Sequence, residues 1–123
     1  MREIKFRAWE KSLKQIIPVD NIDFEKRMVN TESVWRMFDE IELMQYTGLK
    51  DKNGKEIYEG DILDTDLERL YLVVEFRNGC FVVECRDDNE KYYDIMHPLE
   101  KEISNLEYHE VIGNTYENPE LLR

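Results

Sequence analysis

Two runs of β-branched and aromatic residues, separated by a tight turn signal, constrain this fold more than any other feature of the chain. Residues 70–76 and 80–85 are rich in Leu, Val, Tyr and Phe, residues that favour strands. Arg77, Asn78 and Gly79 lie between the two runs, and Asn-Gly is a typical turn pair. We therefore predict an antiparallel hairpin over residues 70–86. Because both of its faces are apolar, we expect it at the centre of a sheet.

The rest of the second half predicts more short strands. Apolar segments begin at residue 62 and recur at 92–95 and 108–116, and Glu59-Gly60-Asp61 forms a turn before the first of them. We expect Val111 and Ile112 to point inside. Five short strands over about 60 residues predict a small barrel, and their count suits an SH3-type or an OB-like barrel.

The first half also favours strands. Residues 3–9 and 15–17 predict a hairpin with a loop of about five residues, and 19–24 a third strand, followed by a loop over 26–31. The stretch 31–44 is ambiguous, because its apolar positions match a helical stripe while 41–46 fits a strand equally well. We favour a short helix or irregular turn over 32–38. Asn53-Gly54 is the strongest turn signal of the chain and predicts a type I′ turn.

Together these patterns predict a mainly β fold with a minor α part. Residues 1–46 would form an N-terminal β-rich region, 47–60 a connecting segment, and 57–123 a small barrel with a C-terminal tail. The length of 123 residues and the hydrophobic fraction of 41% fit one globular domain or two small modules that share a core. No apolar run approaches the about 18 residues of a membrane helix. Charges at Arg2, Glu3 and Lys5 argue against a signal peptide, so we expect a cytoplasmic protein without membrane partners.

The formal net charge of −11 is carried by one half of the chain. Residues 1–56 contain 11 basic and 11 acidic residues, whereas residues 57–123 contain 6 basic and 17 acidic ones. An acidic surface repels phosphates, so the second half is a poor candidate for nonspecific nucleic-acid binding. It favours a soluble, self-repelling surface, and it leaves open an acidic face directed at a basic partner.

The residue types that carry chemistry form no convincing site. Cys80 and Cys85 would lie about 16 Å apart on opposite faces of one strand, too far for a disulfide. Zinc needs four close ligands, and the chain has only these two cysteines with His97 and His109. We expect free, buried thiols, with no redox role and no metal site.

The clusters of acidic residues are also interpreted as structural, and not as metal-binding or catalytic. Asp61, Asp64 and Asp66 could offer oxygen ligands to a hard cation, but a solvated strand end is favoured. The segment 51–54 resembles a calcium-binding loop only superficially, since its glycine comes two positions too early. Glu56, Glu59 and Asp61 lack a neighbouring histidine or nucleophile for acid–base work. The sequence therefore predicts no catalytic residue, no cofactor and no enzyme.

One cationic and aromatic set stands out near the N-terminus. Lys5, Arg7 and Trp9 alternate along the first predicted strand and would share a face. Such a face can stack a base and grip a phosphate, and it is equally what a solvated outer face or a protein contact looks like. We take these three residues as the candidate binding set.

Three segments carry a resemblance to a known family. Residues 46–62 (YTGLKDKNGKEIYEGDI), the opening 4–9 (IKFRAW) and the closing 111–122 (VIGNTYENPELL) resemble the corresponding segments of the YopX family of phage and prophage proteins. The resemblance spans essentially the whole chain. It implies an SH3-type C-terminal barrel and a structural role for the turn residues of the middle segment, which are Gly48, Asn53, Gly54, Gly60 and Asp61.

The resemblance gives origin and architecture but no activity. We expect a non-catalytic phage or prophage accessory protein of a bacterial host that binds another macromolecule, in the first place a protein of host or phage. Two alternatives remain, a nucleic-acid binder using Lys5, Arg7 and Trp9, and an acidic decoy of a host DNA-binding protein. The apolar hairpin and the aromatic content of 11% also leave room for self-association into a homo-oligomer.

Overall fold

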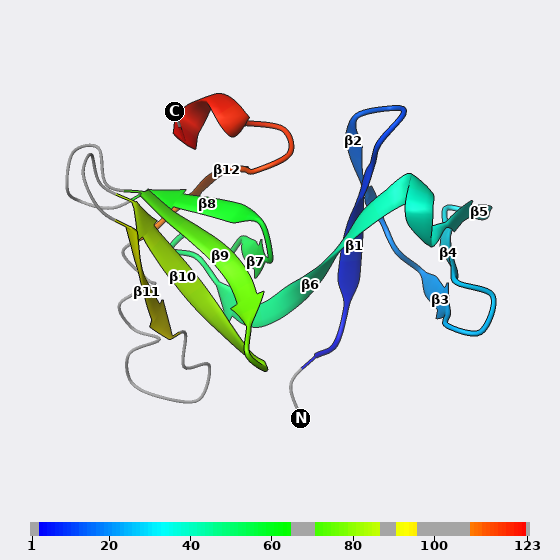
Figure 1. Cartoon of the computed structure of the whole chain (residues 1–123), viewed down its shortest axis with the longest axis horizontal. Coiled ribbons are helices and arrows are strands. Elements are labelled where there is room, and N and C mark those ends of the chain that lie inside the picture. The colour runs from blue at the N-terminus through cyan, green and yellow to red at the C-terminus, as the bar shows by residue number, and fades with distance from the viewer. Residues whose placement is uncertain (1–2, 65–70, 87–90, 96–108, 123) are drawn as a thin grey trace. The chain divides into compact units, whose positions relative to one another are not determined.

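The computed structural model describes residues 3–64, 71–86, 91–95 and 109–122, and these form a mainly β protein (Figure 1). The chain divides into two compact units, Met1–Tyr46 and Thr47–Arg123. The predicted connecting segment 47–60 thus belongs to the second unit. In the described parts the helical content is two 3₁₀ turns, η1 and η2. The prediction of a mainly β fold is confirmed, while the SH3-type assignment of its second unit stays a prediction.

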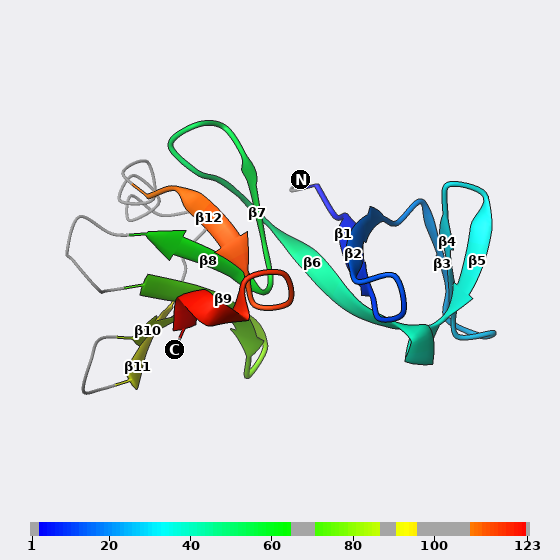
Figure 2. The same cartoon turned by 90° about the horizontal axis from the view of Figure 1, so that it is seen from above.

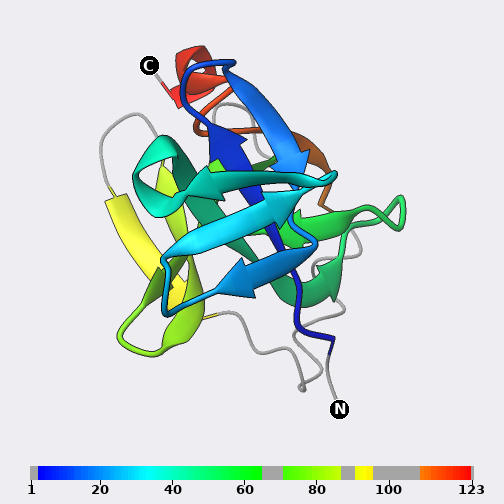
Figure 3. The same ribbon diagram turned by 90° about the vertical axis from the view of Figure 1, so that its right-hand side faces the viewer.

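The first unit is built from two small antiparallel sheets. In one sheet β1 lies between β2 and β6, and in the other β4 lies between β3 and β5. Their elements are β1 (Phe6–Glu10), β2 (Gln15–Pro18), β3 (Asn21–Asp23), β4 (Met28–Thr31), β5 (Val34–Met37), η1 (Phe38–Glu40) and β6 (Ile41–Lys50). Figure 3 shows β3, β4 and β5 side by side. The predicted β1–β2 hairpin and the strand within 19–24 are confirmed.

A small apolar core holds these two sheets together. Ala8 on β1, Val29 on β4 and Ile41 on β6 are buried. Partly buried side chains pack against them, namely Ile17, Val19, Ile22, Phe38 and Leu43. The core thus draws on strands of both sheets.

The second unit contains a five-stranded antiparallel sheet, ordered β11-β10-β9-β8-β12 (Figure 2). The end of β6 enters this unit and pairs with β7. The elements are β7 (Glu56–Tyr58), β8 (Asp61–Asp64), β9 (Tyr71–Arg77), β10 (Cys80–Arg86), β11 (Lys91–Ile95), β12 (Val111–Asn114) and η2 (Pro119–Leu122). One buried cluster fills it, made of Leu49, Ile57, Leu63, Leu72, Val74, Phe81, Val83, Cys85 and Val111.

The hairpin predicted over 70–86 is confirmed as β9 and β10, and it is central in its sheet. Arg77 pairs with Cys80 across a loop of two residues, and the φ angles of Asn78 and Gly79 are +51° and +81°. Positive φ at both positions is what a type I′ turn requires. Both cysteines are free thiols, and Cys85 is buried as expected, whereas Cys80 is partly exposed, so the expectation that it is buried is wrong.

Two predictions in the first half are wrong. The expected loop over 26–31 contains β4, and the expected helix or irregular turn over 32–38 contains β5. The two strands form a hairpin whose loop residues, Glu32 and Ser33, both have positive φ. Apolar residues on both faces of β5 mimic a helical stripe, which explains the error.

Two details in the second unit also differ from expectation. The pairing of β12 with β8 shifts register between Val111 and Gly113, so Ile112 is the extra residue of a bulge and is 36% exposed. The Asn53-Gly54 turn is not type I′, because only Gly54 has positive φ. Asp51 N–H donates to Lys55 O (2.8 Å) and Gly54 N–H to Asp51 O (3.0 Å), which encloses a loop of three residues.

Candidate functional site

The middle segment of the chain is organised around one buried carboxylate, that of Asp51. Its Oδ1 accepts the backbone N–H groups of Asn53 (2.8 Å) and Lys55 (2.9 Å), which closes the loop. Its Oδ2 accepts the N–H of Val111 at the start of β12 (2.9 Å). Asp51 therefore joins its own turn to a strand that follows 60 residues later.

The electrostatics of Asp51 follow from these contacts. Burial raises the pKa of its carboxyl, but the N–H donors of Val111, Lys55 and Asn53 and the nearby Lys55 charge outweigh burial. The net effect holds the pKa below its ordinary value, so the group is ionised at neutral pH. An ionised carboxylate that accepts three amide donors is a structural anchor.

Further hydrogen bonds attach the same strand start to β8. His109 Nδ1 donates to the carbonyl of Asp64 (2.9 Å), and Glu110 N–H donates to Asp64 Oδ1 (3.0 Å). Lys52 N–H also donates to His109 O (3.0 Å). Residues 109–111 are thus held by both the turn and β8. His97 and Asp66, which the sequence analysis considered, lie outside the described residues.

The second turn of the segment is fixed in the same way. Asp61 is buried, and its Oδ2 accepts the N–H of Tyr58 (2.8 Å). Gly60, with φ of +84°, donates its N–H to Val74 O and accepts the N–H of Thr115, each at 2.8 Å. The turn therefore contacts both β9 and the closing segment.

The closing segment completes the network through Asn114, which is buried at the end of β12. Its Oδ1 accepts the N–H groups of Tyr116 (3.0 Å) and Glu117 (2.8 Å). Asn118 Oδ1 accepts the N–H of Asn114 (3.2 Å) and lies where a Cβ on Gly113 would be. The middle and closing segments thus each contain polar side chains that bind backbone groups.

The remaining turn residues fit that description. Gly48 has a φ of +90°, and the neighbouring Thr47 is buried. Thr47 Oγ1 donates to Ile57 O (2.8 Å) and accepts the N–H of Leu49 (3.1 Å). Asn53 lies in the loop that Asp51 closes, and its N–H donates to Asp51 Oδ1. These positions set turns and strand ends.

Lys5, Arg7 and Trp9 lie at and around β1. Arg7 and Trp9 point to the same side of the strand, and both are half-buried. Lys5 precedes the strand, and its ammonium is 3.3 Å from Glu3 and 5.4 Å from the centre of the Tyr46 ring. The Lys5 ammonium, which a phosphate would have to contact, therefore already has partners within the first unit.

Glu10 is a buried carboxylate that the sequence analysis did not single out. It accepts the N–H of Leu13 and the Ser12 hydroxyl (2.9 Å), and Arg36 Nη1 lies 3.9 Å away. The Leu13 N–H is the main cause that lowers the pKa of Glu10, against an opposing effect of burial. The only sequence signal was a Ser two positions later, which is common in turns.

The acidic residues considered for acid–base or metal chemistry make other contacts in the described part of the chain. Asp61 binds its turn, and Glu56 Oε1 accepts the Tyr58 hydroxyl (3.4 Å). Across residues 3–64, 71–86, 91–95 and 109–122, no group of three or more His, Cys, Asp or Glu side chains is placed to hold a metal ion. No helix in those ranges is long and apolar enough to cross a membrane.

The outer face of the β3-β4-β5 sheet carries exposed apolar side chains. Trp35 and Met37 on β5 share this face with Met28 on β4, because Met28 pairs with Met37 and Asn30 with Trp35. Trp35 and Met37 are each 49% exposed. We call Met28, Trp35 and Met37 the β5 face. The alternation of β5 could have revealed it, had the helical interpretation not been preferred.

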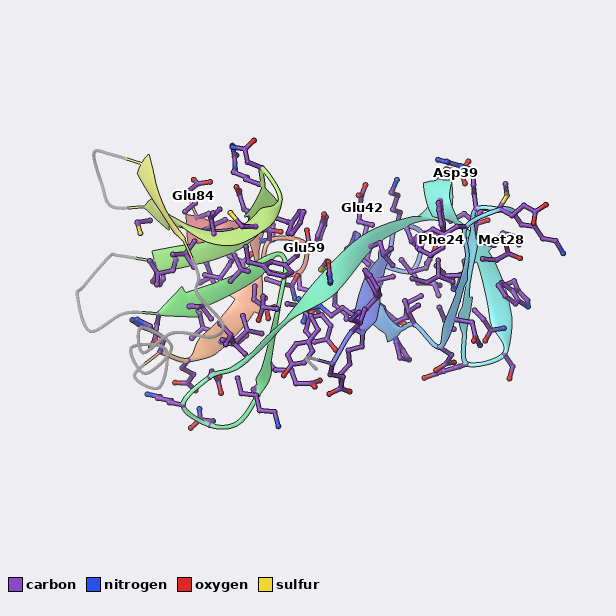
Figure 4. All side chains as sticks on the ribbon, turned by 90° about the horizontal axis from the view of Figure 1, so that it is seen from below. Phe24, Met28, Asp39, Glu42, Glu59 and Glu84 are labelled. Atoms are coloured by element: carbon purple, nitrogen blue, oxygen red, sulfur yellow. The ribbon has the colours of Figure 1, made fainter. Side chains whose placement is uncertain are left out.

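A hollow adjoins the β5 face, and a further exposed ring, that of Phe24, contacts Phe38, which packs against the core. A hollow of about 280 Å³ is lined by Asp23, Lys26, Met28 and Trp35. Phe24 is 72% exposed and meets Phe38 edge-on, with ring centres 6.4 Å apart. Figure 4 marks Phe24 and Met28 at this sheet and Asp39 in η1 beside it. Phe24, Trp35 and Met37 are three of the exposed large apolar side chains in the first unit's described residues.

Comparison with known proteins places the chain in a family. The crystal structure of protein EF1440 from Enterococcus faecalis is similar over 100% of both chains, with 26% identity and a TM-score of 0.65. No curated protein matches the chain. Residues 5–123 match the family model described as YopX protein. The chain therefore belongs to the YopX family.

Proposed function

We propose that this protein is a non-catalytic accessory protein of a phage or prophage, acting in the bacterial cytoplasm by binding another protein. The observation that carries the proposal is the β5 face, with Trp35 and Met37 each half-exposed on a single strand. Exposed apolar clusters of this kind are typical of protein-binding surfaces, where Trp and Met are enriched. Trp in particular often contributes a large share of binding energy.

The distribution of polar side chains supports a binding role. Asp51, Asp61 and Asn114 are buried and bind backbone groups, so these three side chains support the scaffold of this chain. Lys5 contacts Glu3 and Tyr46, which reduces the weight of the nucleic-acid alternative. These contacts favour the apolar β5 face as the recognition surface.

A pull-down from bacterial lysate tests this proposal. The tagged protein is compared with a Trp35→Ala, Met37→Ala variant, each with and without nuclease, and bound proteins are identified by mass spectrometry. We expect a nuclease-resistant partner that the double variant loses. A Leu13→Ala variant is the matched control, because Leu13 is an exposed apolar side chain on the β1–β2 loop.

Other outcomes would contradict the proposal. Partners that vanish with nuclease would shift the interpretation to nucleic acid and to Lys5, Arg7 and Trp9. A nuclease-resistant partner that the double variant retains and that normally binds DNA would favour the acidic decoy. Loss of the partner in the Leu13→Ala variant as well would show that the β5 face is not the contact.

A further inference from the structure

β5 is the edge strand of its sheet, and half of its backbone groups point away from β4. The two-residue loop makes Thr31 and Val34 a hydrogen-bonded pair, and Phe38 N–H donates to Arg27 O (2.9 Å). Because hydrogen-bonded and non-hydrogen-bonded pairs alternate, Trp35 and Met37 direct their N–H and C=O groups outward. Among the described strands, β5 pairs with β4 alone.

The edge of β5 carries no proline and no bulge, two of the features that commonly prevent strand addition. Short length and charged side chains also protect edge strands. The one charge within β5 is Arg36, whose Nη1 lies 3.9 Å from Glu10 and whose Nε donates to Thr31 Oγ1 (3.4 Å). Its guanidinium is therefore drawn to the core side. The pairing of β5 with β4 is regular across all four residues.

The two ends of β5 carry negative charge. Glu32 is exposed at the loop before β5, and Asp20 lies beside it, accepting its N–H (2.9 Å). Asp39 and Glu40 are exposed after the strand. The cations near that end have partners, since Lys11 is 3.4 Å from Glu42 and Arg27 lies over the Phe38 ring at 5.4 Å.

These features define a ligand by shape and charge. An added strand would pair with the outward groups of Trp35 and Met37, and its alternate side chains would extend the β5 face. Basic residues at its two ends would meet the acidic ends of β5, which favours the correct partner and register. From Glu32 to Asp39 the distance along a strand is roughly 23 Å, the length of seven or eight residues.

We propose that β5 accepts an extended segment of a partner protein as a fourth strand, apolar at alternate positions and basic at both ends. This inference rests on the proposed function and specifies its mode of binding. The partner is thus a protein with an exposed basic–apolar–basic strand. A second copy that offered its own β5 would not meet that description, because residues 32–40 are acidic at both ends.

A peptide titration tests the inference. The probe is the capped peptide Lys-Thr-Val-Thr-Ile-Thr-Val-Lys, and the controls carry Glu for both Lys residues or Pro for the central Ile. Binding is followed by NMR on the labelled full-length protein. We expect shifts and slower amide exchange at Trp35 and Met37, and affinity for the probe about tenfold or more above that for either control.

A charge-reversed variant sharpens the test. In Glu32→Lys, Asp39→Lys, Glu40→Lys the preference should invert, so that the Glu-ended peptide binds more tightly than the probe. All three residues are exposed, and circular dichroism with thermal unfolding would verify that the fold is kept. Trp35→Ala should weaken binding of the probe to the natural protein and binding of the Glu-ended peptide to the charge-reversed variant.

Specific results would overturn the inference. These are absence of probe binding, equal affinity for the proline peptide, shifts that map away from β5, or no inversion in the charge-reversed variant. A dimer in sedimentation whose β5 amides are already protected would show that a second copy takes the edge. If these results came with a partner that depends on Trp35 in the pull-down, the proposed function would stand and only strand addition would fail.

Discussion

Asp51 shows how a single residue of the family motif acts. Its carboxylate is buried, and it accepts N–H groups from its own loop and from Val111 at the start of β12. A backbone N–H that is buried without an acceptor destabilises the folded state. The side chain therefore determines whether the closing strand stays attached to the turn, although it touches no exposed surface.

Removing this carboxylate should destabilise the protein strongly. In Asp51→Ala three backbone donors lose their acceptor, and we expect the free energy of unfolding to fall by on the order of 3 kcal/mol. Urea unfolding followed by circular dichroism measures it. Asp39→Ala is the control, since Asp39 is exposed and should change stability little. Equal effects of the two substitutions would refute the role assigned to Asp51.

The same residue predicts a pH dependence. Because the pKa values of Asp51 and Glu10 are lower in the folded than in the unfolded state, the unfolded state binds more protons in acid. Their stabilisation is present above the ordinary carboxyl values of about 4 and is lost as the pH falls through the folded values. The stability gap between the natural protein and Asp51→Asn should therefore be widest near neutral pH and narrow below pH about 4. Urea unfolding at several pH values checks this, and a constant gap would contradict it.

At the scale of elements, β12 depends on a close approach at Gly113. A Cβ at this position would collide with the Asn118 side chain, whose Oδ1 accepts the N–H of Asn114. Gly113→Ala should therefore cost about 1–3 kcal/mol of stability, the usual cost of a forced fit. Adding Asn118→Ala removes the obstacle, so the double variant should lose less than the sum of the two single effects. Strict additivity in thermal unfolding would show that the collision is relieved elsewhere.

Three hairpins show which elements the sequence could predict. Asn78-Gly79 has two residues that tolerate positive φ, and both adopt it, so the β9–β10 hairpin was predictable. Asn53-Gly54 carries the same signal, yet Asp51 bonds to the loop amides and sets a loop of three residues. Glu32 and Ser33 take positive φ without any sequence signal, because the strands beside them pair and bury Val29 and Thr31. The positions of the two Asn-Gly turns could be predicted from the local sequence, whereas the type of the Asn53-Gly54 turn and the presence of the Glu32-Ser33 turn could not.

The β5 face and the role of Asp51 could not be predicted from the sequence for a related reason. Val34, Trp35 and Met37 fit a helical stripe as well as a strand, and only the pairing of β5 with β4 separates the two interpretations. The partners of Asp51 lie up to 60 residues away, so its role could not be inferred from spacing. By contrast, the free thiols of Cys80 and Cys85 followed directly from strand geometry.

At the scale of the whole molecule, charge is unevenly divided between the two units. Residues 57–123 hold 17 acidic and 6 basic residues, whereas the β5 face belongs to the nearly balanced first half. Net charge of one sign keeps a protein soluble and also destabilises the compact state by self-repulsion. The β5 face thus belongs to the part of the chain in which acidic and basic residues balance, whereas the acidic excess lies in residues 57–123.

This imbalance makes a prediction about salt. Raising NaCl from about 0.01 M to about 0.5 M shortens the Debye length from about 30 Å to well under 10 Å, which screens repulsion among the acidic residues. Exposed ion pairs such as Lys52–Glu110 (3.7 Å) lose little, because such pairs contribute little in water. The melting temperature should therefore rise by a few degrees. The variant Glu117→Gln, Glu120→Gln has two fewer negative charges and keeps an acceptor for Asn114 Nδ2. Its melting temperature should therefore rise less with salt. A melting temperature that fell with salt would mean that attraction between charges, instead of repulsion, dominates in this protein.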